Sequence, residues 1–152
     1  MRYRKAVFIV TYRKARPRFC KSYTILYLVL KRKLHWTGWE FPKGGMENGE
    51  NLTSSVKREL EEETGQITSN IKKFKEEGKY RYDKEYPDRK GIIGQTYTLF
   101  SAELKSKKIK LDKKEHSDYK WLSFKKAEKI LTWKNQKECL RIVNNFMSRT
   151  EI

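Results

Sequence analysis

Apolar residues fall into dense runs that predict a chain rich in β-strands. Residues 4–12 and 24–30 are almost continuously β-branched, aromatic or aliphatic, and each segment predicts a buried strand. Residues 14–18 contain a proline and predict a turn, and the basic residues 31–33 end the second strand. Residues 35–43 combine a proline with a glycine and predict a loop or a short edge strand.

The second half of the chain carries weaker strand patterns separated by charged segments. Residues 71–82 are rich in lysine but hold three aromatic residues, which predicts a solvated strand. Residues 83–91 predict a charged loop, and residues 92–104 predict another strand. The basic run at 105–114 predicts a solvated hairpin tip before a last strand at 117–122.

Three helices are expected from residue spacing and capping signals. Leu52, Val56 and Leu60 recur every four residues, and Gly65 follows where a helix end favours positive φ. Ser123 is a suitable N-cap for a short helix. The end of the chain repeats apolar residues at helical spacing, which predicts an amphipathic helix carrying Cys139, Leu140, Ile142, Val143, Phe146 and Met147.

Length and composition favour one folded α/β domain. The chain has 152 residues, a size that suits a single hydrophobic core. Hydrophobic residues make up 37% and aromatic residues 13%, which argues against disorder although 36% of residues are charged. No internal repeat and no composition shift divides the sequence. We therefore expect residues 1–152 to form one domain.

The charge of the chain has two interpretations that the sequence leaves open. Lysine and arginine number 36 against 19 aspartate and glutamate residues, giving a net charge of +17. Such a field attracts polyanions such as nucleotides, RNA or phosphorylated small molecules. Because the lysines are spread along the whole chain, the same charge could equally reflect a composition bias that keeps the surface soluble.

Cysteine usage and hydropathy predict a cytoplasmic protein. Cys20 and Cys139 have no metal-binding spacing, and two cysteines cannot build a disulfide framework, so reduced thiols are expected. The first apolar run, residues 6–10, is too short for a signal peptide. No run approaches the length of a membrane span, so no membrane association is expected.

The candidate chemistry lies in the predicted helix that Gly65 ends. Glu59, Glu62 and Glu63 stand at i, i+3 and i+4 and therefore share one helix face, whereas Glu61 points elsewhere, into water. Three carboxylates on one face repel one another unless a cation gathers them. Carboxylate oxygens suit a hard divalent ion, so the spacing predicts Mg²⁺ or Mn²⁺.

This segment resembles the Nudix box, a motif of fixed spacing. The matching positions would coincide by chance on the order of 10⁻⁸ times per starting residue, which outweighs the alternative of an ordinary solvated acidic helix. One position departs from the pattern: Gln66 stands where an apolar residue is usual, and we expect Ile67 to take its place. The matching residues are Gly44, Glu50, Arg58, Glu59, Leu60, Glu62, Glu63 and Gly65.

The resemblance implies an α/β/α sandwich with a mixed sheet and a central metal-binding helix. It further implies an enzyme that hydrolyses phosphoanhydride bonds in nucleotides with Mg²⁺ or Mn²⁺. The implied metal ligands are the three helix carboxylates, the carbonyl of Gly44 and a fourth carboxylate, for which we choose Glu115 over a surface role. His116 is expected to be a positioning or surface residue rather than a zinc ligand.

Other residues of the motif receive supporting or catalytic roles. Glu59, Glu63 and Glu115 are the expected catalytic carboxylates. Arg58 is expected to orient a carboxylate, and its alternative is an ordinary helix ion pair. The resemblance assigns structural roles to Gly45, Glu50 and Gly65.

Segments beside the motif resemble one Nudix branch, the asymmetrical dinucleoside tetraphosphate hydrolases. The similar segments are residues 39–44, 80–90, 115–116 and 119–122. Members of that branch split diadenosine tetraphosphate into ATP and AMP. The likeness implies phosphate contacts and base stacking by Lys43, Lys84, Lys90 and Tyr82. The branch often has a histidine where this chain has Gly45.

Two other functions remain open at this stage. Gly94-Gln95 resembles an element of Nudix enzymes that remove pyrophosphate from RNA 5′ ends, and the net charge of +17 would suit RNA. A non-catalytic nucleic-acid-binding protein on a Nudix fold is disfavoured, because all the motif carboxylates are present. The sequence leaves the exact nucleotide and the oligomeric state open.

Overall fold

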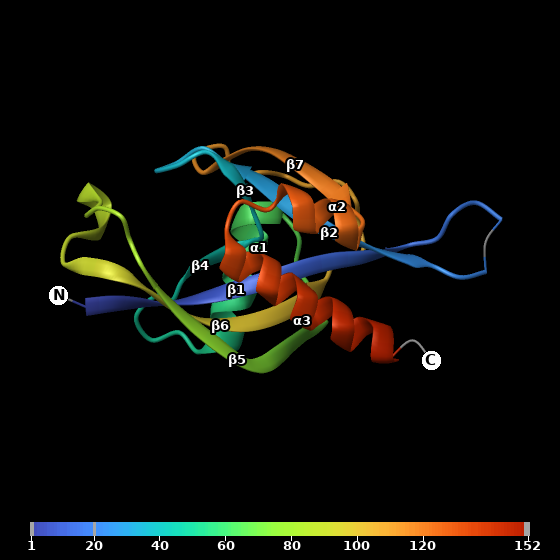
Figure 1. Ribbon diagram of the computed structural model, residues 1–152, viewed down its shortest axis with the longest axis horizontal. Coiled ribbons are helices and arrows are strands. Elements are labelled where there is room, and N and C mark those ends of the chain that lie inside the picture. Colours follow the sequence, from blue (N-terminus) through green and yellow to red (C-terminus); the bar gives the residue numbers. More distant parts are fainter. Residues whose placement is uncertain (1, 20, 151–152) are drawn as a thin grey trace.

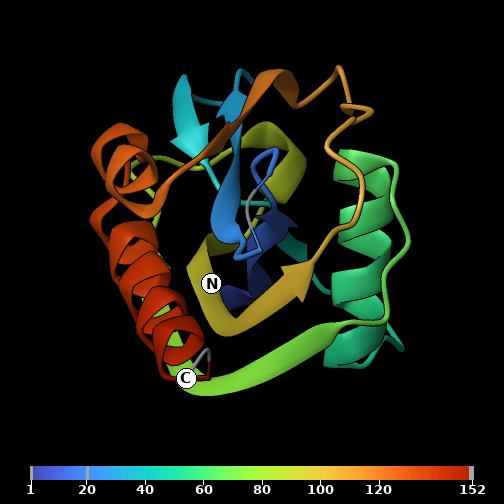
Figure 2. The same cartoon turned by 90° about the vertical axis from the view of Figure 1, so that its right-hand side faces the viewer.

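The computed structural model describes residues 2–19 and 21–150 and consists of three layers (Figure 1). A seven-stranded sheet forms the middle layer, with α1 on one face and α2 and α3 on the other (Figure 2). The predicted α/β/α sandwich is confirmed. Cys20 lies outside the described residues.

Most predicted elements are present, several with shifted ends. The helices are α1 (Leu52–Thr64), α2 (Phe124–Ile130) and α3 (Lys134–Thr150), and a 3₁₀ turn, η1, spans Pro87–Arg89. The strands are β1 (Arg2–Ala15), β2 (Thr24–Arg32), β3 (Gly38–Glu40), β4 (Lys43–Gly45), β5 (Ile71–Arg81), β6 (Ile92–Glu103) and β7 (His116–Leu122).

The sheet is mixed, as predicted. Its order is β3-β2-β1-β6-β5, with β4 paired to β1 and β7 paired to β2. Only β1 and β6 run parallel; the other pairs are antiparallel. The long strand β1 pairs with β4 through Ala6–Phe8 and with β2 through Tyr12–Ala15. This pairing sets the short strand β4 beside the centre of the sheet, next to α1.

Alternating residues of β1 fill two separate cores. Val7 and Ile9 pack with Leu60 of α1, whereas Phe8 and Val10 pack in the core that contains Leu140 of α3. Successive strand residues point to opposite faces, so a strand covered on both sides must be apolar throughout. This explains the continuous apolar run that the sequence shows.

The predicted caps of α1 and α2 are observed. Asn51 accepts a hydrogen bond from the amide of Ser54 at 2.8 Å and begins α1. Gly65 ends it with φ of 75°, and its amide donates to the carbonyl of Glu61 at 2.9 Å. The side chain of Ser123 caps α2. These local signals fix both ends of the central helix.

Two expectations about the second half were wrong. Residues 105–114 are not a hairpin tip, because β6 pairs with β1 and β5 while β7 pairs with β2. The segment instead crosses beside the end of α1, where Lys110 donates its amide to the carbonyl of Thr64 at 2.9 Å. Ile67 does not replace the apolar motif residue, since it is 81% exposed. The Gln66 side chain holds the crossing segment through the carbonyls of Ser106 and Lys108.

The strand ends differ from the sequence prediction for tertiary reasons. β1 continues through the predicted turn to Ala15, because it pairs with Thr24 of β2. β2 continues through Lys31 and Arg32, which pair with both β3 and β7. No helix among the described residues is long and apolar enough to cross a membrane.

Candidate active site

Two carboxylates of α1 are buried one turn apart at the edge of β4. Glu59 is 7% exposed and Glu63 only 1%, while the side chain of Glu62 is 51% exposed. The backbone amide of Lys43 donates to Oε2 of Glu63 at 3.1 Å. The other oxygen, Oε1, is buried and has no hydrogen-bond partner among the described residues.

Burial and mutual repulsion make these carboxylates reluctant to ionise. Loss of solvent raises the pKa of Glu59 to about 7, although the neighbouring Arg58 opposes this shift. Burial, followed by the charges of Glu59 and Glu40, raises the pKa of Glu63 well above its usual value. Such crowding of acidic groups calls for a cation in the same place.

The surroundings fit a hard divalent cation. Ligand atoms of Glu63, Glu115 and His116 lie within 4.8 Å of one another. The unpartnered Oε1 of Glu63 offers a free oxygen ligand in this cluster. Gly44 leaves room for the Glu59 carboxylate, since a Cβ at Gly44 would lie 2.0 Å from its Cδ. The residues present therefore suit Mg²⁺ or Mn²⁺.

Arg58 ties the loop before α1 to the helix carboxylates. Its guanidinium donates to Glu50 at 2.7 Å, to Glu59 at 2.9 Å and to Glu62 at 3.2 Å. A further bond at 2.9 Å reaches the carbonyl of Gly45. Glu50 also accepts from the amide of Glu47. Arg58 thus forms the ordinary helix ion pair and also holds the Glu59 carboxylate in place.

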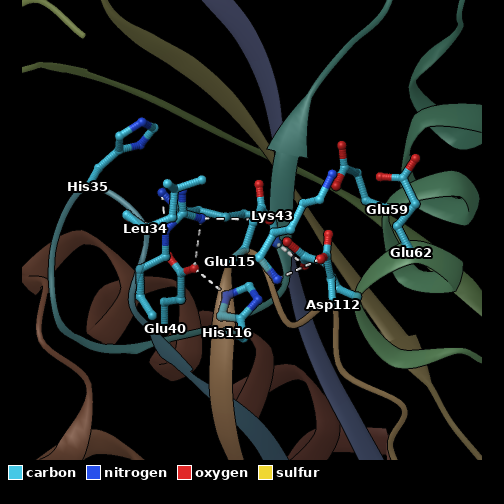
Figure 3. Close-up of polar contacts among 12 residues, drawn as sticks. Leu34, His35, Glu40, Lys43, Glu59, Glu62, Asp112, Glu115 and His116 are labelled. Atoms are coloured by element: carbon cyan, nitrogen blue, oxygen red, sulfur yellow. Dashed lines mark hydrogen bonds and ion pairs between the residues drawn. The ribbon is translucent and has the colours of Figure 1, made fainter. Parts of the chain in front are cut away.

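A buried ion cluster beneath the carboxylates was not singled out from the sequence. Glu40 is completely buried and contacts Nε2 of His116 at 2.7 Å, Arg32 at 3.2 Å and the Lys43 ammonium at 3.5 Å. Although burial opposes ionisation, Lys43, the hydrogen bond from His116 and Arg32 lower the pKa of Glu40 to about 2. Figure 3 shows Lys43 between Glu40 and the helix carboxylates.

His116 and Glu115 occupy different positions in this cluster. His116 is fully buried, so its surface alternative was wrong, and its bond to Glu40 fixes the ring. Glu115 is 31% exposed and lies 3.9 Å from Arg32. A glutamate between aromatic residues in Trp39-Glu40-Phe41 was the one signal of a buried charge.

The comparisons with known proteins now identify the family. Residues 2–141 match the NUDIX domain. The chain belongs to the Nudix family. The predicted family and its hydrolase class are confirmed.

Two relatives carry different activities in their names. The Nudix chain is 30% identical over 127 residues to the asymmetrical bis(5′-nucleosyl)-tetraphosphatase of Mus musculus, covering 84% of each protein. It is 38% identical over 96 residues to an RNA pyrophosphohydrolase of Nitratiruptor sp., covering 57% of this chain. The matched part is 59% of that bacterial protein, which is less than two thirds of its length.

A solved structure supports the Nudix fold. The crystal structure of a Caenorhabditis elegans Ap4A hydrolase binary complex aligns with a TM-score of 0.75 and 23% identity. The alignment covers 95% of this chain and 98% of that one. At this identity the likeness concerns the fold.

The Nudix carboxylates face a polar groove that adjoins an aromatic pocket. The groove encloses about 250 Å³ and is lined by Glu59, Glu62, Glu115 and several cations. The pocket encloses about 470 Å³. Both are lined by Arg32, Lys43 and Arg89, so these cations mark their junction. The aromatic residues of the pocket include Trp36, Tyr80, Tyr82, Tyr86 and Trp133.

The structure distributes the predicted substrate residues unevenly. Lys43 borders both the groove and the pocket, whereas Tyr82 and Lys84 border the pocket alone. Lys90 is exposed just after η1 and lines neither of these two hollows. Gly65 lies at the far end of α1, against Lys110.

Proposed function

We propose that this Nudix protein hydrolyses a phosphoanhydride bond of a nucleoside polyphosphate, with Mg²⁺ or Mn²⁺ as cofactor. The preferred substrate is a bis(5′-nucleosyl)-tetraphosphate, cleaved to a nucleoside triphosphate and a nucleoside monophosphate. The observation that carries the proposal is the junction of an acidic groove with an aromatic pocket through Arg32, Lys43 and Arg89.

The pocket suits a nucleobase and the junction suits phosphates. Trp36 and Trp133 pack edge to face with ring centroids 5.2 Å apart, and Trp133 is 47% exposed, so its ring is available to a base. Stacking of one base on an aromatic side chain contributes roughly 1–3 kcal/mol. The Lys43 ammonium stands where the phosphates would pass from the pocket to the carboxylates.

The carboxylate set can hold the cofactor. Glu59, Glu63 and Glu115 would provide oxygen ligands, with the Gly44 carbonyl beside them and the half-exposed Glu62 at the rim. When bound, a divalent ion polarises phosphate oxygens and lowers the pKa of an attacking water.

The remaining steps belong to side chains of this chain. Arg58 fixes the orientation of Glu59, and the buried Glu40 holds Lys43 and Arg32 at the junction, where their charges neutralise phosphate oxygens. Glu115 is partly exposed and is placed to accept the proton of the attacking water.

Product analysis tests the proposed reaction. Diadenosine tetraphosphate and Mg²⁺ should yield ATP and AMP in equal amounts, and EDTA should stop the reaction. Formation of two ADP molecules would contradict asymmetrical cleavage. Absence of hydrolysis across a panel of nucleotides with Mg²⁺ and with Mn²⁺ would refute the enzyme and favour a binding protein.

A second candidate is removal of pyrophosphate from triphosphorylated RNA 5′ ends. It is favoured by the likeness to the Nitratiruptor protein and by the net charge of +17. Contacts to many RNA phosphates would make binding fall steeply with salt. Comparison of kcat/KM for RNA and for the dinucleotide at several salt concentrations separates the two substrates.

A further inference from the structure

The cations that line the acidic groove differ in how their charges are balanced. Three of them have carboxylate partners in the protein. Arg32 and Lys43 pair with Glu40, and Arg58 pairs with glutamates on and before α1. These three charges are therefore largely satisfied before any substrate arrives.

The other two cations of the groove are Arg4 and Arg89. Within residues 2–19 and 21–150, neither guanidinium has a carboxylate oxygen within ion-pair distance. Both side chains are partly buried, which makes an unbalanced charge costly. Burial and the charge of Arg89 lower the pKa of Arg4, as expected for two like charges held together.

The fold holds this pair in place from three separate segments. Arg89 donates to the Tyr82 hydroxyl at 3.0 Å, and Arg4 hydrogen-bonds to the same hydroxyl. Gly45 makes the space for Arg4, because a Cβ there would lie 1.8 Å from Nε. Two guanidiniums are thus preorganised beside the helix carboxylates without an anion between them.

The segment that carries Arg89 is also fixed to the body of the protein. Asp88 hydrogen-bonds Nε2 of His35 at 3.1 Å, and the ring of Tyr86 lies 4.3 Å from that of His35. His35 adopts φ of 73°, an unfavourable conformation for a residue other than glycine. These contacts keep η1 over the groove.

We propose that Arg4 and Arg89 form a phosphate site that makes the enzyme prefer substrates with three or more linked phosphates over those with two. This inference rests on the proposed function and specifies the substrate class of the same groove. Lys43, Arg32 and the cofactor would hold the phosphates at the cleaved bond. Further phosphates in the chain then meet the two guanidiniums that the protein leaves unbalanced.

Binding of inorganic polyphosphates tests this site without catalysis. Calorimetry in EDTA compares tripolyphosphate with pyrophosphate for the wild type, Arg4→Gln, Arg89→Gln and the double variant. Arg141→Gln is the matched control, because Arg141 is a surface residue paired with Glu128 at 2.7 Å. We expect the wild type and the control to bind tripolyphosphate at least about tenfold more tightly than pyrophosphate.

The expected result is that this ratio falls about tenfold in the double variant and partly in each single variant. Arg89→Lys, which keeps the charge, should retain most of the ratio. A double variant with the wild-type ratio would overturn the inference. If the double variant fails to fold by circular dichroism, the single variants decide by the same criterion.

A kinetic arm separates this inference from the proposed function. The KM values for adenosine dinucleotides with two, three and four phosphates are compared for the same variants. An unchanged KM ratio with normal hydrolysis refutes the arginine site alone. Loss of all hydrolysis by the wild type with a preserved binding ratio refutes the proposed reaction and leaves the site standing.

Discussion

Replacement of Glu59 by glutamine should make the metal-free protein more stable at neutral pH. The folded state raises the pKa of Glu59 from 4.5 to about 7, so its ionised form is disfavoured in the fold. Between these values the folded state binds more protons than the unfolded state, and the free energy of unfolding falls as pH rises. Glutamine resembles the protonated form and removes this loss.

The size of the effect follows from the pKa change. A rise from 4.5 to about 7 corresponds to roughly 3 kcal/mol, and Glu59 is only 7% exposed, so solvent screening is slight. Glu59→Gln and wild type should be similarly stable near pH 4.5. Above pH 7 the variant should be more stable by up to roughly 3 kcal/mol.

Urea unfolding in EDTA across this pH range measures the difference. Glu61→Gln is the matched control, since Glu61 is exposed on the same helix. Added Mg²⁺ should stabilise the wild type and the control but not Glu59→Gln. A variant that is less stable than wild type at pH 8, or a difference independent of pH, would refute the reasoning.

Three further substitutions test the site. Glu63→Gln should lower kcat by orders of magnitude while circular dichroism shows an intact fold. Gly44→Ala should lower metal-dependent activity and cost about 1–3 kcal/mol in urea unfolding, because its Cβ would overlap the Glu59 carboxylate. Glu40→Gln should destabilise by about 3–5 kcal/mol, measured in the same way, since it leaves the buried charge of Arg32 without its partner. Unchanged unfolding of Glu40→Gln would contradict the role of the buried ion cluster.

Local patterns predicted what depends on neighbours in sequence. The caps at Ser123 and Gly65 were recoverable because capping involves residues a few positions apart. The shared face of Glu59 and Glu63 followed from helical periodicity alone. The continuous apolar run of β1 correctly indicated a strand covered on both faces.

Pairings between distant segments could not be predicted in this way. Glu40, Arg32 and His116 are brought together by β3, β2 and β7, and no spacing along the chain records that meeting. The polar Gln66 was treated as a defect of the motif, yet it binds carbonyls of a segment about 40 residues away. Arg4 and Arg89 were overlooked because each is an ordinary surface arginine until the fold removes its counterions.

The most direct test of the account is Mn²⁺ binding followed by electron paramagnetic resonance. Wild type, Glu63→Gln and Glu61→Gln are titrated under the same conditions. The account predicts that wild type and Glu61→Gln bind alike and that Glu63→Gln loses at least about tenfold in affinity. Equal binding by Glu63→Gln and Glu61→Gln would show that the buried face of α1 does not hold the ion.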